Sequence, residues 1–189
     1  MKLLWALLLA SFLSASGLWM SPTAAAATPA DSVQIVHPGE GEARFLGGTP
    51  VTFKTFVAGD DPDQFSITES PIQPGEGAPF HKHAAESFYV LAGDFEFYAG
   101  QPDGSIKTIK ASAGDLINIP AGIPHAPKNV GSTSGKLLTI TGSDWFQNFL
   151  LEASNPAEGE ASDLGVPSLA KMAPIAAKYG IEFVDPDHL

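Results

Sequence analysis

Three histidines and one glutamate have the residue types and the spacing for metal chemistry. His81 and His83 flank Lys82, and Glu86 follows three positions after His83. If this segment is a β-strand, His81 and His83 point to one face and Lys82 to the other, because side chains alternate along a strand. Two imidazoles on one face can bind one metal ion, and a carboxylate on the next strand can complete a facial ligand set with open positions.

A second segment places the third histidine directly after a turn. Its marked positions are Gly114, Pro120, Gly122, His125 and Asn129. Pro120 and Gly122 favour a turn that reverses the chain, so His125 would open a new strand. In an antiparallel barrel, that strand can bring His125 opposite the other two histidines. We expect the Gly, Pro and Asn residues of this framework to be structural.

Composition limits both the ligand types and the partners. The chain has no cysteine, which excludes disulfides, thiolate metal sites and a cysteine nucleophile. Metal ligands must therefore be nitrogen or oxygen atoms. The net charge of -11 disfavours nucleic acid and anionic membranes as partners. Ser87 lacks the flanking glycines of a hydrolase nucleophile, and neither a phosphate loop nor a dinucleotide-binding motif is present in the sequence.

The residues around these segments have the pattern of an all-β domain. Between residues 43 and 143, runs of β-branched and aromatic residues alternate with clusters of Gly, Pro, Asp and Ser. Many short strands joined by turns produce this pattern, which predicts a β-sandwich or barrel. We expect five phenylalanines to contribute mainly to its core: Phe53, Phe65, Phe80, Phe88 and Phe97.

The N-terminus is typical of a secretory signal peptide. Lys2 precedes an apolar run over residues 3–20, and small residues lead up to Ala27, after which we predict cleavage. The prediction is a signal peptide over residues 1–27 and export to the periplasm or the extracellular space. An uncleaved membrane anchor is the alternative, since the run is almost long enough to span a bilayer. After cleavage we expect no contact with the membrane.

The remaining segments flank the predicted barrel. Residues 28–42 are predicted to be a flexible lead-in, because small and polar residues dominate there. Residues 144–189 are predicted to be a helical segment that packs on the barrel, with short helices over Trp145–Leu151 and Ser168–Tyr179. His37 and His188 lie outside the barrel region, and we expect no chemistry from them.

Both histidine-containing segments resemble the two sequence motifs of the cupin superfamily. The second segment carries all five positions named above, and the first matches at Gly75, His81, His83, Glu86 and Gly93. The first departs from the family pattern because only Ala84 and Ala85 separate the second histidine from the glutamate, where the family usually has a longer connection. An Ala-Ala link is unfavourable in a tight hairpin. Glu86 can therefore be a direct ligand, a ligand through water, or a base.

The resemblance implies a fold and a site. The fold is an all-β, single jelly-roll barrel over residues 43–143, with short C-terminal helices. The site is one divalent first-row metal ion (Fe, Mn, Ni, Cu, Co or Zn) bound by His81, His83, Glu86 and His125. Such proteins frequently form homodimers.

The resemblance is strongest to small single-barrel, type-2 cupins described as similar to quercetin 2,3-dioxygenase. It implies a metal-dependent dioxygenase that acts on a small aromatic or flavonol-like substrate, with Glu86 as the catalytic residue that takes a substrate proton. Because one fold carries many functions, two alternatives stay open. They are a non-catalytic exported module that binds a metal or small ligand, and another cupin metal enzyme such as an isomerase or decarboxylase.

Overall fold

The computed structural model describes residues 33–57, 61, 63–156 and 168–188. The predicted signal peptide, residues 1–27, and residues 28–32 of the predicted lead-in lie outside the described residues. Within the described part of the chain, no helix combines the length and the apolar character needed to cross a membrane.

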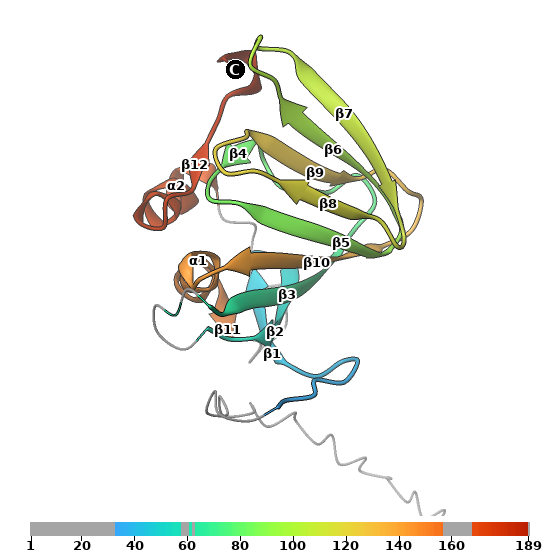
Figure 1. The fold of residues 1–189 in the computed structure, drawn as a ribbon, viewed down its shortest axis with the longest axis vertical. Helices are drawn as coiled ribbons and strands as arrows, with labels where there is room; N and C mark the ends of the chain where they lie inside the picture. Colours follow the sequence, from blue (N-terminus) through green and yellow to red (C-terminus); the bar gives the residue numbers. More distant parts are fainter. Residues whose placement is uncertain (1–32, 58–60, 62, 157–167, 189) are drawn as a thin grey trace, which may run out of the picture.

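The chain folds into two sheets whose named strands all pair antiparallel (Figure 1). The first is seven-stranded, in the order β11-β1-β2-β3-β10-β5-β8, and the second is five-stranded, in the order β12-β4-β9-β6-β7. The strands are β1 (Glu42–Leu46), β2 (Thr49–Thr55), β3 (Phe65–Ile72), β4 (His81–Lys82), β5 (Glu86–Ala92), β6 (Asp94–Gly100), β7 (Ile106–Ser112), β8 (Leu116–Ile119), β9 (His125–Asn129), β10 (Gly135–Gly142), β11 (Asn155–Pro156) and β12 (Glu182–Phe183). The prediction of an all-β jelly-roll barrel is confirmed.

Alternation of side chains along the strands builds the barrel core. Alternate residues of β5, β6 and β8 point inward, and six of them form one apolar cluster with Ala111 and Leu137. Its members are Phe88, Val90, Phe95, Phe97, Ala111, Ile117, Ile119 and Leu137. Their burial removes apolar surface from water and stabilises the two-sheet arrangement.

The prediction that Phe65 lies in the core is wrong. Its side chain is 57% exposed, whereas Phe53, Phe88 and Phe97 are buried. Phe65 begins β3, and the alternation of that strand turns Ser66 inward instead. The alternation of polar and apolar residues in β3 therefore led to the wrong choice of inward face, because the inward residues of this strand are polar.

The C-terminal segment packs against the first strands of the large sheet. It contains α1 (Trp145–Ala153), α2 (Leu169–Lys178), and a 3-10 helix, η2 (Pro186–His188). A second apolar cluster joins both α-helices to β2, and its buried members are Val51, Phe53, Phe149, Leu150, Ala176 and Ile181. Strand β12 then pairs with β4, so the last part of the chain reaches the strand that carries His81.

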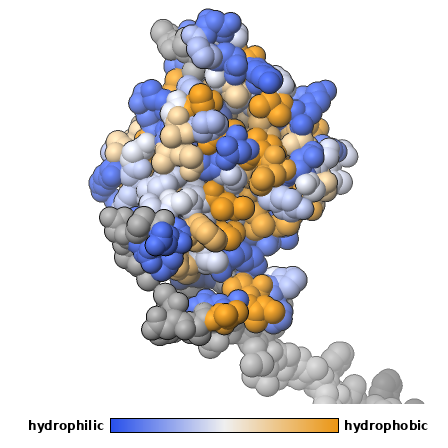
Figure 2. Space-filling model, viewed as in Figure 1, coloured by the Kyte–Doolittle hydropathy of each residue, from blue (hydrophilic) through white to orange (hydrophobic). Residues whose placement is uncertain are grey.

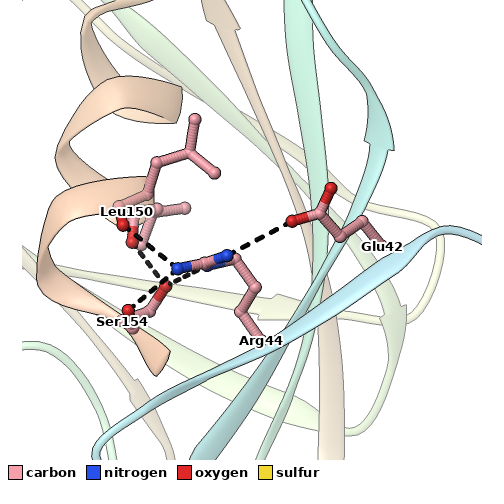
Figure 3. Close-up of polar contacts among 5 residues, drawn as sticks. Glu42, Arg44, Leu150 and Ser154 are labelled. Carbon is pink, nitrogen blue, oxygen red and sulfur yellow. Dashed lines mark hydrogen bonds and ion pairs between the residues drawn. The ribbon is translucent and has the colours of Figure 1, made fainter. Parts of the chain in front are cut away.

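Arg44 on β1 holds the end of α1 (Figure 3). Its guanidinium donates hydrogen bonds to Ser154 Oγ at 2.7 Å, Ser154 O at 3.0 Å and Leu151 O at 3.1 Å, and it lies 3.3 Å from a carboxylate oxygen of Glu42. The last carbonyl groups of a helix have no partner within the helix and carry partial negative charge. Arg44 satisfies two carbonyls at this end, those of Leu151 and Ser154, and the contact fixes α1 to the sheet.

The outer face of the large sheet carries exposed apolar residues. Figure 2 shows hydrophobic side chains gathered across the middle of the face on which β5 and β8 run. Tyr89 and Leu91 on β5 and Leu116 on β8 are exposed, and Tyr89 is the direct cross-strand neighbour of Leu116. These three residues form an apolar row on the outside of the barrel.

Replacing Arg44 with alanine is expected to lower the free energy of unfolding by about 2–3 kcal/mol, because partly buried hydrogen bonds from a charged donor are lost. Urea unfolding measures the change. The control is Lys107→Ala, which removes an exposed charge from β7. Equal stability of the two variants would show that Arg44 does not hold α1.

Candidate metal centre

The pairing of two short strands brings the histidines together. Strand β4 lies beside β9, and His81 is the direct cross-strand partner of His125. His83 follows two residues later on the same face as His81, and Glu86 begins β5 in the other sheet. The site therefore lies inside the barrel, where the two sheets approach each other.

The four predicted ligands form one compact cluster. One ligand atom from each of His81, His83, Glu86 and His125 lies within 4.8 Å of all the others. The ring centroids are 4.4 Å apart for His81 and His125, 4.9 Å for His81 and His83, and 5.0 Å for His83 and His125. Glu86 Oε1 lies 2.5 Å from His125 Nε2 and 3.1 Å from His83 Nε2.

The short Ala84-Ala85 link does not displace Glu86, because it is not a hairpin turn. Strand β4 pairs with β9 and β12, whereas β5 pairs with β10 and β8. The two alanines thus carry the chain from one sheet to the other. The backbone N–H of Gly122 donates to His83 O at 2.8 Å and holds the link in place. The side chain of Glu86 points inward and is 2% exposed.

Backbone carbonyls orient all three imidazole rings. The Nδ1 atoms donate to carbonyl oxygens in each case: His81 to Pro79 at 2.7 Å, His83 to Ala84 at 2.6 Å and His125 to Ile123 at 2.9 Å. A carbonyl only accepts, so Nδ1 carries the proton and the Nε2 of a neutral ring keeps its lone pair. This arrangement is usual for histidines that bind metals.

The donor set fits a metal ion. Three Nε2 atoms converge with a carboxylate, and His83 Nε2 is buried without a hydrogen-bond partner among the described residues. Lone pairs and a negative charge that converge on one point repel one another, and a cation bound between them removes this repulsion. Three imidazole nitrogens and a carboxylate oxygen suit first-row transition metals.

The electrostatics of the cluster keep two of the ligands, Glu86 and His81, in their metal-binding forms. Burial alone would raise the pKa of Glu86, but the adjacent imidazoles of His125 and His83 outweigh it and lower the pKa to about 2. Burial and the neighbouring His125 lower the pKa of His81 to about 4. Burial opposes protonation of His83 too, yet its contact with Glu86 raises its pKa. At neutral pH, Glu86 is therefore ionised and His81 is neutral.

Two aromatic residues from the C-terminal segment lie beside the cluster, and the sequence did not indicate their role. The Trp145 ring lies over His83 with centroids 4.6 Å apart, and Phe183 on β12 lies 6.5 Å from His81. The sequence placed Trp145 only at the start of a predicted helix. No sequence motif marks either residue, because only the folding of the tail onto the barrel brings them to the site.

A cavity of ≈ 170 Å³ opens onto two of the four ligands, His81 and Glu86. Its walls are mostly apolar, with Phe88, Phe146 and Phe183 among them. Ser70 and Thr139 contribute hydroxyl groups. A small molecule in this cavity would be surrounded by carbon and would meet polar atoms mainly at the candidate metal site.

Comparison with known families agrees with this geometry. Residues 69–141 match the family described as "Cupin domain", and this match includes all four candidate ligands. The chain contains a cupin domain. An acireductone dioxygenase from Trichormus variabilis is 36% identical over 75 residues, which are 38% of this chain and 41% of that protein. The chain thus spans about two fifths of the length of this curated relative.

Solved structures similar to this cupin include an RmlC-like cupin from Shewanella frigidimarina and oxalate decarboxylase from Bacillus subtilis. The first is 21% identical with a TM-score of 0.46, and the match covers 59% of this chain and 92% of that chain. The second is 18% identical with a TM-score of 0.46, and the match covers 60% of this chain and 31% of that chain.

Acidification is expected to destabilise the metal-free protein in two stages. The unfolded chain takes up a proton on His81 near pH 6.5, whereas the folded protein does so only near pH 4, so the free energy of unfolding falls as the pH falls between these values. Glu86 adds a further loss as the pH falls from 4.5 to about 2. The raised pKa of His83 adds a constant amount to the free energy of unfolding below pH 6.5, so it does not contribute to either stage.

Urea unfolding of chelator-treated protein across this pH range measures both stages. The His81→Gln variant should lose less stability between pH 6.5 and pH 4 than the wild type does. Parallel losses in the two proteins would contradict the assignment to His81.

Proposed function

We propose that this cupin domain binds one divalent first-row transition metal ion (Fe, Mn, Ni, Cu, Co or Zn) through His81, His83, Glu86 and His125. We further propose that it is a metal-dependent dioxygenase for a small aromatic substrate. The observation that carries the proposal is the buried convergence of three oriented Nε2 atoms and a carboxylate beside an apolar cavity. The similarity to a protein named acireductone dioxygenase favours a dioxygenase over the alternatives.

The bound metal would supply Lewis acidity and redox chemistry toward dioxygen and substrate oxygens. The protein's own residues orient and enclose the reactants. His81 and Glu86 face the cavity, so a substrate would approach the site from their side. Trp145 covers His83 on another side of the cluster.

The low pKa of Glu86 supports one of the roles that the sequence left open. A carboxylate with a pKa of about 2 is a poor proton acceptor near neutral pH, since an efficient base has a pKa near the working pH. The same carboxylate is well suited to be a metal ligand, because it stays ionised. We therefore propose that Glu86 is primarily a direct ligand and contributes to catalysis by holding the metal.

The cavity supports a one-ring substrate over a flavonol. Its volume of ≈ 170 Å³ is close to the ~150 Å³ of an apolar protein cavity that binds benzene. A flavonol has three rings and would require a larger space. An aromatic ring with two adjacent oxygens would place the ring among Phe88, Phe146 and Phe183 and the oxygens at the metal site.

Two wider proposals rest on other observations. Export to the periplasm or extracellular space, without membrane or nucleic-acid partners, rests on the sequence of residues 1–27 and on the net charge of -11. Homodimer formation is supported by the exposed apolar row of Tyr89, Leu91 and Leu116, since apolar rows on an outer sheet face are suitable for association.

Metal analysis of the full chain tests the site. Protein purified without chelators or a histidine tag should contain about one equivalent of a first-row metal. The His81→Ala/His125→Ala variant should contain at least about tenfold less. The matched control is His37→Ala/His188→Ala, which changes the two histidines outside the cluster and should keep the metal. Equal metal content in all three proteins, or none after reconstitution, would refute the site.

Oxygen uptake by metal-loaded protein tests the reaction and the size limit. A catechol should support oxygen consumption with a kcat/KM at least about tenfold higher than that of a flavonol, because the larger substrate exceeds the cavity. Carbon dioxide release without oxygen consumption would instead indicate a decarboxylase. Tight metal binding without turnover of any candidate would indicate a binding module.

A further inference from the structure

The inner face of the large sheet is polar where β3 and β10 meet. Ser66 and Thr68 on β3 and Thr139 and Thr141 on β10 all point inward and are exposed by 1%, 1%, 8% and 1%. Alanine or valine would fill similar volumes without a polar atom. Four hydroxyl groups in a barrel interior therefore call for a hydrogen-bonding role, because buried polar groups are nearly always paired.

Two of these hydroxyls lie in one cross-strand row with Glu86. Thr141 is the direct partner of Ser66 on β3 and of Glu86 on β5. Direct neighbours of this kind have Cβ atoms about 4.5–5.5 Å apart. Ser66 Oγ and Thr141 Oγ1 are both buried, and neither has a hydrogen-bond partner within the described residues.

We propose that Ser66 and Thr141 bind an internal water molecule in this row, beside Glu86. Two opposed hydroxyls that do not reach each other can be joined by one water, which typically makes about three hydrogen bonds inside a protein. The carboxylate of Glu86 is the next polar group in the row and is the acceptor for the third. Neither Ser66 nor Thr141 lines the cavity, so the occupant is water and not a substrate group.

This water site does not depend on the proposed metal. The water would donate to the Glu86 carboxylate from the side of β10. His125 on β9 and His83, which precedes the Ala84-Ala85 link, contact the carboxylate from other directions. The tests therefore use the metal-free, full-length protein, and their outcome is independent of whether the dioxygenase proposal succeeds.

The substitution Thr141→Val keeps the side-chain volume and removes the hydroxyl. If the hydroxyl binds water, thermal unfolding should occur at a Tm lower by about 2–4 °C, since a chain of this size shifts by that amount for the loss of a typical hydrogen bond. The control is Thr108→Val, the same change at an exposed position of β7, which should leave Tm nearly unchanged. A higher Tm for Thr141→Val would show that the hydroxyl is buried dry and would overturn the proposal.

A double-variant cycle tests whether the two hydroxyls share one water. Ser66→Ala as a single change should lower Tm. In the Thr141→Val background it should lower Tm clearly less, because the water is already lost. Fully additive losses would overturn the shared site. A high-resolution crystal structure of the wild type needs no variant: a water about 2.7–3.0 Å from both hydroxyl oxygens is expected, and its absence would overturn the proposal.

Discussion

The burial of the Glu86 carboxylate is the constraint on which the rest of the site depends. An ionised carboxylate inside a protein is very unfavourable unless positive charge or strong hydrogen-bond donors surround it. Here two imidazole nitrogens lie within 3.1 Å of one oxygen, and the third imidazole belongs to the same cluster. Each ring is in turn held by a backbone carbonyl, so the cluster is organised before any ligand binds.

The barrel and the C-terminal segment together enclose this cluster. The β4–β9 pair sets the histidines, and the link of two alanines carries Glu86 in from the opposite sheet. The C-terminal segment then places Trp145 against His83 and Phe183 near His81. Because Arg44 holds the end of α1 against β1, a contact far from the cluster in sequence helps to position the helix that begins at Trp145.

The sequence predicted the class of fold and the four residues that meet, but not what surrounds them. Strand alternation and turn residues are local properties, so a barrel could be inferred from them. The candidate site was predicted from the spacing of His81, His83 and His125 together with the resemblance to the two cupin motifs. The side-by-side placement of Trp145 and His83 depends on long-range packing of the tail, which no local pattern records.

Two details of the prediction were decided by tertiary context. Phe65 is exposed because the polar row of Ser66 and Thr141 occupies the interior at that level, against the usual preference of phenylalanine for the core. The Ala84-Ala85 link was judged as a hairpin because strands adjacent in sequence usually pair. Its strands belong to different sheets, so turn preferences did not apply. The size of the cavity also followed only from packing.

The position of Trp145 has an optical consequence. The chain has three tryptophans, at positions 5, 19 and 145, and the first two lie within the predicted signal peptide. A chain that begins after Ala27 would therefore carry a single indole chromophore, and that chromophore lies against His83. Its emission would respond to any ion with partly filled d orbitals that enters the cluster, so the protein would report the occupancy of its own site without an added dye.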